Sequence, residues 1–304
     1  MSTAEQNRLD EAKNVANQAF ANKLDEVGLR SGVYNIAFLQ NDTAGMEKQF
    51  NWAVGKPGIE DSFFATQAET EAYNGRLAKS RELLVRATSS ARSNDATETA
   101  ALYQSYSAFH DAEFGEFGNA QKEMDAALAI AKSVNIETFA ALVFARCGNA
   151  ARATALADQL NKEFPVNTVV QSIWLPVIHA GVEMSRNNPD KAIEDLQAAS
   201  PYDLGGVPPV WGMYAVLVRG EAFLQARRGK EAAAEFQKMI DHRGVVGNSA
   251  TGALAHLGLA RAFVLQGDTA HARAAYQDFL GLWKDADADI PILVAAKAEY
   301  AKLR

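Results

Sequence analysis

A short pattern that returns seven times along the 304 residues constrains the fold of this chain more than any other feature of its sequence. The clearest copy, Leu259–Phe279, predicts a helix, a turn at Gly267 and Asp268, and a second helix. Gly267 suits the left-handed conformation that often ends a helix, and Asp268 is a good N-cap for the next one. Ala260 is small enough to let the two helices approach, and Tyr276 fills the space between them. This copy therefore predicts an antiparallel helical hairpin.

The spacing of the copies gives the length of the repeated unit. One small or contact residue recurs in each predicted second helix: Met46, Ser80, Ala120, Ala153, Ala192, Ala232 and Ala272. The steps between them are 34, 40, 33, 39, 40 and 40 residues. Steps of 33 or 34 fit one helix-turn-helix hairpin, and the steps near 40 leave about six residues over. The turn-rich segments Ser200–Pro209 and His242–Ser249 are the expected places for these extra residues.

Both ends of the chain predict helices that close the array. A terminal hairpin exposes an apolar face unless another element covers it. Gln6–Lys23 has the pattern of a leading helix, and Pro291–Leu303 has the apolar spacing of a closing one. We therefore expect a single domain over residues 1–304, with a leading helix at 6–23, about seven hairpins at 24–290 and a C-terminal capping helix at 291–304.

Composition agrees with a folded helical protein. The chain is rich in residues that favour helix, and an apolar content of 48% is more than a disordered chain carries. A net charge of −7 argues against a nucleic-acid surface, which needs a basic stripe. The start of the chain, Met1–Arg8, lacks the apolar stretch of a signal peptide, and no run of 18 apolar residues occurs. We expect no membrane insertion by this chain and a cytoplasmic location.

The seven units resemble tetratricopeptide repeats. Four segments also resemble the repeat regions that follow the kinase domain, or a winged-helix DNA-binding domain, in large bacterial signalling proteins, especially those of acidobacteria: Ala37–Ala44, Asn188–Ile193, Glu235–Gly244 and Ala274–Asp287. The likeness runs from about Leu9 to Leu303, essentially the whole chain. It implies an all-α, right-handed superhelical solenoid of about seven tetratricopeptide-like hairpins with terminal capping helices. In such proteins the catalytic or DNA-binding module lies N-terminal, outside this chain.

Several segments resemble motifs of known chemistry but lack residues that those motifs require. Asp285–Asp289 resembles the start of a calcium loop, but Ile290 replaces the required glycine and Ala296 the bidentate glutamate, so a helix-capping acidic turn is favoured. Asp241–Gly244 lacks the aspartate of a kinase catalytic loop. Cys147 is the only cysteine, and the five histidines show no metal-ligand spacing. We expect no catalytic residue, no metal site and no cofactor, hence a protein that is not an enzyme.

The first helix of each hairpin is expected to line a concave groove that accepts an extended or helical segment of a partner. By the register above, the residues of this surface are Asn35, Phe38, Glu69, Tyr73, Phe109, Glu113, Arg146, Trp174, Tyr214, Glu221 and Arg261. Tryptophan, tyrosine and arginine dominate binding energy at interfaces. Aromatic residues also pack between repeats, and we expect about half of the set to be packing residues of that kind.

One class of ligand is disfavoured. Tetratricopeptide proteins that bind acidic chaperone tails hold the terminal carboxylate with lysine, arginine and asparagine on these helices. Asn35 fits that role, but the expected basic neighbours in the next two units are absent.

Three functions remain open at this point. The leading one is a non-catalytic scaffold for a protein or peptide partner, without nucleic acid, as the docking or sensing part of a bacterial signalling system. The second is self-association into a homo-oligomer. The third is a sensor that encloses a small ligand or peptide, because about seven hairpins approach one superhelical turn. The alternative to a cytoplasmic location is an extracytoplasmic one, in which the chain is the tail of a membrane-anchored signalling protein.

Overall fold

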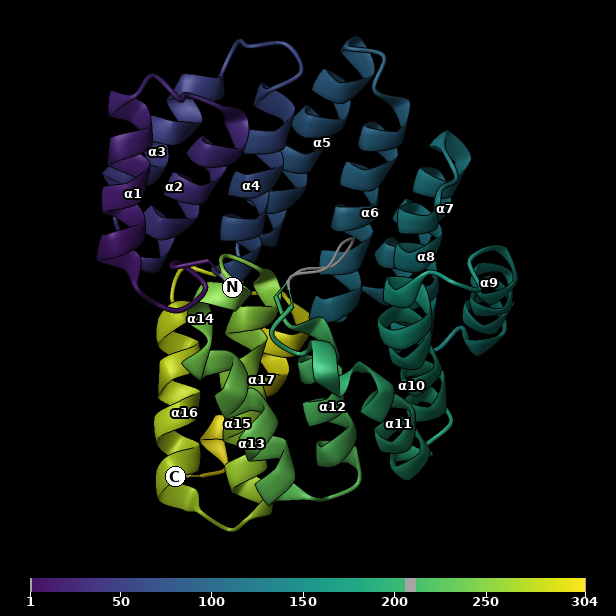
Figure 1. The fold of residues 1–304 in the computed structure, drawn as a ribbon. Coiled ribbons are helices and arrows are strands. Elements are labelled where there is room, and N and C mark those ends of the chain that lie inside the picture. The colour runs from purple at the N-terminus through teal and green to yellow at the C-terminus, as the bar shows by residue number, and fades with distance from the viewer. Residues whose placement is uncertain (1, 206–211, 304) are drawn as a thin grey trace.

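The computed structural model describes residues 2–205 and 212–303. Within these ranges the regular structure is helical throughout, and fourteen of the helices pair as seven antiparallel hairpins (Figure 1). The pairs are α2 (Val27–Leu39) with α3 (Thr43–Ala53), α4 (Glu60–Tyr73) with α5 (Leu77–Ser93), α6 (Thr97–Phe114) with α7 (Phe117–Ile130), α8 (Val134–Arg146) with α9 (Ala150–Glu163), α10 (Leu175–Ser185) with α11 (Pro189–Asp195), α12 (Tyr214–Gln225) with α13 (Gly229–Asp241), and α15 (Ala250–Leu265) with α16 (Thr269–Leu282). The predicted all-α helical repeat fold is confirmed.

The repeat positions lie where the spacing predicted, in the second helix of each hairpin. Six of the seven are fully buried, from Ser80 to Ala272, and Met46 is half-buried. Small side chains at these points let the two helices of a hairpin approach closely. In each first helix from α4 onward, at least half of the residues are buried: α8 buries ten of 13, whereas its partner α9 buries three of 14. The first helices therefore form the inner layer, and the second helices present a wide polar face to water.

Each of the seven hairpin turns contains one residue in the left-handed conformation. Glycine occupies four of these positions, asparagine two and arginine one: Asn41, Gly75, Gly115, Gly148, Asn187, Arg227 and Gly267. The turn predicted at Gly267 and Asp268 forms as expected, since the Asp268 carboxylate accepts the backbone N–H of His271 at 3.1 Å. The left-handed turn residue predicted from one copy is therefore present in all seven hairpins.

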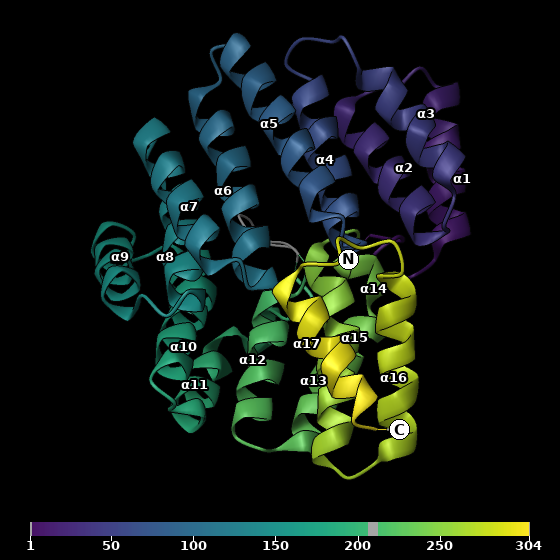
Figure 2. The same cartoon turned by 180° about the vertical axis from the view of Figure 1, so that it is seen from behind.

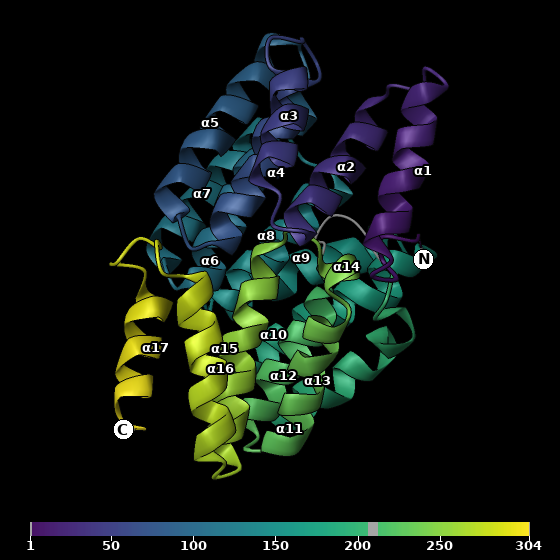
Figure 3. The ribbon, with the colours of Figure 1, turned by 90° about the vertical axis from the view of Figure 1, so that its left-hand side faces the viewer.

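The array bends back on itself. Figures 1 and 2 show α2–α7 in one half and α10–α13 with α15 and α16 in the other. Helices α8 and α9 lie at the bend, and α14 (Arg243–Val246) lies between the halves on the opposite side. Helix α4 packs directly against α15 there. The leading helix α1 (Leu9–Ala21) packs on α2, and the closing helix α17 (Pro291–Ala301) lies beside α16 at the edge of the second half (Figure 3).

Hydrogen bonds hold this closure. The Trp283 indole N–H donates to the Tyr73 carbonyl at 2.9 Å, and the Asn248 amide donates to the Thr66 carbonyl at 2.8 Å. The Asp287 carboxylate accepts a backbone N–H at the start of α5 at 2.7 Å. The acidic turn therefore caps a helix, as expected, but the helix is α5 of a distant hairpin.

In three of the four longer units, the described extra residues include a short helix. In the segment Ser200–Pro209, the 3-10 helix η2 (Leu196–Tyr202) extends through Tyr202, while Gly206–Pro209 lies outside the described residues. In the segment His242–Ser249, α14 forms one helical turn. A further short helix, the π-helical turn η1 (Val170–Trp174), continues directly into α10.

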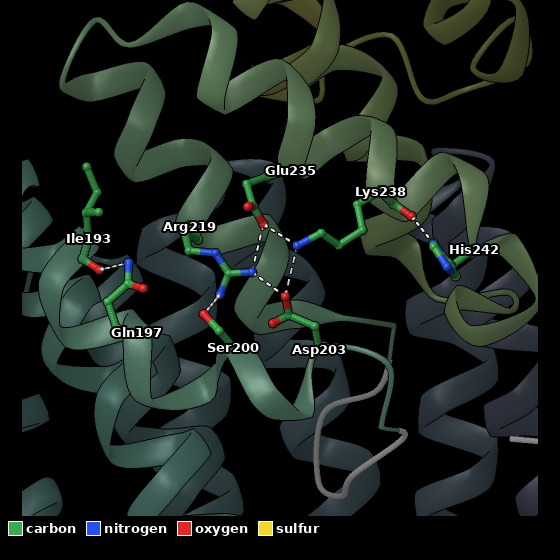
Figure 4. A network of polar contacts seen from close by, with 8 residues as sticks. All are labelled: Ile193, Gln197, Ser200, Asp203, Arg219, Glu235, Lys238 and His242. Atoms are coloured by element: carbon green, nitrogen blue, oxygen red, sulfur yellow. Dashed lines mark hydrogen bonds and ion pairs between the residues drawn. The ribbon is translucent and has the colours of Figure 1, made fainter.

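A buried arginine fixes η2 to the sixth hairpin (Figure 4). Arg219 of α12 is 3% exposed, and its guanidinium contacts the Asp203 carboxylate at 2.6 Å and the Glu235 carboxylate at 2.7 Å. It also donates to the Ser200 hydroxyl at 3.2 Å. Lys238 pairs with Asp203 at 3.0 Å. Two cations thus compensate two carboxylates at the junction of η2, α12 and α13.

Candidate binding pocket

A cavity of 570 Å³ lies where the first helices of the first four hairpins, α2, α4, α6 and α8, converge. The part of the lining that comes from these helices includes Gly32, Asn35, Glu69, Tyr103, Tyr106, Phe109 and Phe139, and we call this cavity the aromatic pocket. Two segments border it from outside the four helices: residues 244–249 around α14, and the N-terminal residues Ser2, Ala4 and Glu5. Three of the eleven predicted residues, Asn35, Glu69 and Phe109, line it.

Four aromatic rings form one wall of the pocket. Tyr106 lies 6.1 Å from Tyr103 and 5.4 Å from Phe139 between ring centroids, and Phe109 lies 5.7 Å from Phe139. The pairs are tilted or edge-to-face, the arrangements that aromatic rings prefer. Sequence reasoning selected Phe109 alone. The spacing of Tyr103, Tyr106 and Phe109, three residues apart along one helix, is the signal that could have identified the other rings of α6.

The carboxylate of Glu69 stands at the pocket beside a buried histidine. Glu69 is 25% exposed, and its Oε1 lies 2.9 Å from Nε2 of His110, which is 1% exposed. The other ring nitrogen of His110 lies 3.2 Å from the Ser80 hydroxyl. Burial alone would lower the pKa of His110, but the charge of Glu69 and its hydrogen bond outweigh burial and raise that pKa above its usual value. His110 therefore holds Glu69 in position from behind the pocket wall.

A second carboxylate lies behind Tyr103. The Tyr103 hydroxyl donates to Oδ2 of Asp61 at 2.9 Å, and Asp61 is buried. Within the described part of the chain, Oδ1 of Asp61 has no hydrogen-bond partner. A buried carboxyl group therefore lies directly behind this ring of the pocket.

Four more of the predicted residues form a polar cluster deeper in the bend. Arg146 contacts Glu113 at 3.1 Å and Glu221 at 2.8 Å, and the Tyr214 hydroxyl donates to Glu113 at 2.7 Å. Burial raises the pKa of Glu113, although the charge of Arg146 opposes the shift. Conversely, the two carboxylates raise the pKa of Arg146 against the effect of its burial. The Phe109 ring lies 5.1 Å from that of Tyr214, so the cluster adjoins the aromatic pocket.

The remaining four predicted residues lie elsewhere. Phe38 and Tyr73 are in edge-to-face contact at 5.0 Å and line a separate cavity of 780 Å³ between the two halves. Arg261 pairs with Glu299 of α17 at 2.9 Å, so it fastens the closing helix. Trp174, like Tyr214 of the polar cluster, is almost fully buried, at 2% and 4% exposed. These two rings pack inside the molecule and present almost no surface to a partner in this structure.

Within residues 2–205 and 212–303, no group of three or more histidine, cysteine, aspartate or glutamate side chains is placed to hold a metal ion. Burial raises the pKa of the half-buried Cys147 thiol to about 11, which disfavours the thiolate. No helix in the described ranges combines the length and the apolar character needed to cross a membrane.

Comparison with known proteins gives distant structural similarities only. No protein-family model and no curated protein matches the sequence. A tetratricopeptide repeat protein from Parabacteroides merdae aligns over 99% of both chains, with 13% identity and a TM-score of 0.49. Yeast Tom70 aligns over 98% of this chain and 59% of its own, with 14% identity and a TM-score of 0.48. The tetratricopeptide domain of P58(IPK) aligns over 97% and 98%, with 10% identity and a TM-score of 0.34.

These values are too low to transfer a partner or a binding mode to this chain. They also give no support to the closer resemblance, drawn from the sequence, to the repeat regions of bacterial kinases and winged-helix regulators. A functional proposal for this chain therefore rests on the geometry of the pocket.

Proposed function

We propose that this chain is a non-catalytic protein-interaction module that binds an extended segment of a partner protein in the aromatic pocket. The observation that carries the proposal is the convergence of four first helices on one cavity of 570 Å³. In stacked helical hairpins the inner helices create the binding surface. A cavity of this size is in the range that holds a drug-sized ligand, which is comparable with a few residues of a peptide.

An unpaired acceptor in the pocket favours a ligand with N–H groups. Among the described residues, Oδ1 of Asn35 is buried and has no hydrogen-bond partner. Such an atom destabilises the protein by about 1–3 kcal/mol until a donor reaches it. A peptide supplies a backbone N–H at every residue except proline. Oδ1 of Asn35 is buried in this structure, so Asn35 can bind the backbone of a partner segment only after its side chain rotates.

The test uses a displayed library of random peptides selected against the immobilised chain and two variants. Gly32 lines the pocket, and a Cβ atom there would meet no atom within 4 Å, so Gly32→Leu narrows the pocket without a clash. Gly118 on α7 is equally open and does not line the pocket, which makes Gly118→Leu the matched control. We expect to select peptides that bind the parent and Gly118→Leu but do not bind Gly32→Leu.

Two results would contradict the proposal. One is the absence of any enriched peptide with the parent chain. The other is a set of peptides that bind the parent and Gly32→Leu equally, because such peptides would occupy another surface. Circular dichroism of all three proteins checks that each variant is folded.

The closure of the array favours a second candidate, a sensor for a small molecule held in the same pocket. Helix α4 packs against α15, and the segment 244–249 borders the pocket. The pocket is therefore more enclosed than a groove on an open array. Thermal denaturation in the presence of a library of small metabolites would identify such a ligand as an increase in melting temperature. The increase should disappear in Gly32→Leu and persist in Gly118→Leu.

A docking or sensing role in a bacterial signalling system is the finer form of the proposal. Its support is the sequence resemblance of segments such as Ala37–Ala44 to repeat regions of signalling proteins. Identification of a kinase or regulator as the protein that carries the selected peptide motif would support this role.

A further inference from the structure

The aromatic pocket carries charge of one sign. Among its described lining residues, the charged side chains are Glu5 and Glu69, and both are acidic. Asp61 adds a buried carboxylate behind the ring of Tyr103. The adjoining polar cluster holds two carboxyl groups, Glu113 and Glu221, and the single guanidinium of Arg146. The charged side chains that line the pocket are therefore acidic, and His110 compensates Glu69 only from behind the wall.

An aromatic ring of the pocket strengthens this preference. The face of an aromatic ring is the negative end of its quadrupole and attracts a cation within about 6 Å of the centroid. Tyr103, Phe109 and Phe139 are at most 6% exposed, so Tyr106, which is half-buried, is the ring that a cation in the pocket can contact. Glu69 lines the same pocket and can provide the counter-charge. The Tyr106 ring and this carboxylate together disfavour an acidic ligand and favour an organic cation.

We propose that the aromatic pocket takes the basic side chain, arginine or lysine, of the segment that the chain binds. This inference rests on the proposed function and names the chemistry of the residue that anchors the partner. The cation lies against Tyr106 and pairs with Glu69, while the backbone beside it donates to the rotated Asn35 side chain. His110 is a positioning residue, because it contacts Glu69 from outside the pocket.

The experiment begins with the peptides selected in the library test. We expect one position in them to be enriched in arginine or lysine. The enriched peptide is then made with arginine and with citrulline, which has nearly the same shape and no charge, and both are titrated by fluorescence anisotropy. Replacement of arginine by citrulline should weaken binding to the parent by about tenfold.

Variants locate the effect in the pocket. Glu69→Gln keeps an oxygen that can accept a hydrogen bond from His110, and it should weaken the arginine peptide by about tenfold while leaving the citrulline peptide nearly unchanged. Tyr106→Leu should also weaken binding of the arginine peptide. Tyr106→Phe retains the ring and should bind this peptide as the parent does. Glu98→Gln, which removes an exposed carboxylate from the same helix as Tyr106, is the charge-matched control and should have little effect.

The outcomes separate the two proposals. Selected peptides without a shared basic residue, or equal affinity for the arginine and citrulline peptides, would overturn the basic anchor and leave the peptide-binding function intact. Failure to select any peptide overturns both. Binding of agmatine, a free guanidinium compound, without any selected peptide would overturn the peptide source and support the small-molecule candidate instead.

Discussion

Individual turn residues decide how easily each hairpin closes. In the sixth hairpin, Arg227 occupies the left-handed position that glycine occupies in four others. A residue with a Cβ atom is strained in this conformation, and glycine is not.

Arg227→Gly is therefore expected to stabilise the protein by roughly 0.5–1 kcal/mol, after the greater freedom of glycine in the unfolded chain is taken into account. The opposite change, Gly148→Ala, places a Cβ atom in the same conformation with no atom within 4 Å, so it tests conformation alone. It should destabilise by about 1 kcal/mol. Urea denaturation measures both, and a loss of stability in Arg227→Gly would show that the arginine side chain contributes more than its strain costs.

The pair of His110 and Glu69 makes stability depend on pH. Because the folded-state pKa of His110 is raised above its ordinary value of 6.5, the pair stabilises the fold fully below pH 6.5 and less as the pH rises through the raised value. Ser80 of α5 faces the same ring, and Asp111 and Glu113 on its own helix add negative charge.

Removing the partner charge with Glu69→Gln should consequently destabilise the protein most between about pH 5 and 6.5. The difference in free energy of unfolding between parent and variant should shrink at higher pH. Chemical denaturation over a series of pH values measures this difference. A difference that is constant with pH would mean that His110 stays neutral in the folded protein throughout.

At the scale of elements, short insertions differ from the hairpins in what stabilises them. A hairpin is held by two apolar faces, whereas η2 buries Leu196 and Ala199 and is also held by the ion pairs of Arg219 with Asp203 and Glu235. Removal of a buried cation leaves its carboxylates uncompensated, and the usual loss is about 3–5 kcal/mol.

Arg219→Met should destabilise by about 3 kcal/mol, the lower end of that range, because Lys238 still pairs with both carboxylates. Lys238→Met removes a cation that is 33% exposed and should have a smaller effect. Urea denaturation of the two variants gives the comparison. Equal losses would indicate that the two cations contribute equally to the network of four charges.

At the scale of the whole molecule, closure joins halves that would otherwise be independent. In an open array of hairpins each unit contacts only its neighbours, so distant units can unfold separately. Here Asn248 and Asp287 reach across to α4 and α5.

Combined Asn248→Ala and Asp287→Ala substitutions should weaken this contact and let the two halves unfold in separate transitions. Hydrogen exchange followed by mass spectrometry should then show faster exchange in α2–α4 and α15 than in the bend at α8. The parent chain should instead unfold in one transition. If the variant also unfolds in one transition, the cooperativity arises from the contacts around the bend and not from closure.

The sequence by itself determined the helical hairpins, their number and their turns. Repeat spacing, helix propensity, capping and the left-handed turn residues all act within one unit, so Ala272, Gly267 and Asp268 could be placed without knowledge of the rest of the chain. It also placed the eleven predicted residues on first helices, or in η1 at the start of α10.

Only the tertiary structure decided which of those residues meet. Glu113 and Tyr214 are 101 residues apart in the chain and 2.7 Å apart in space, and Trp174 is buried although it lies at a predicted surface position. The curvature of the array is the sum of small rotations between successive hairpins, and no local pattern encodes that sum. For this reason the aromatic pocket and the closure were not predictable from the residues that form them.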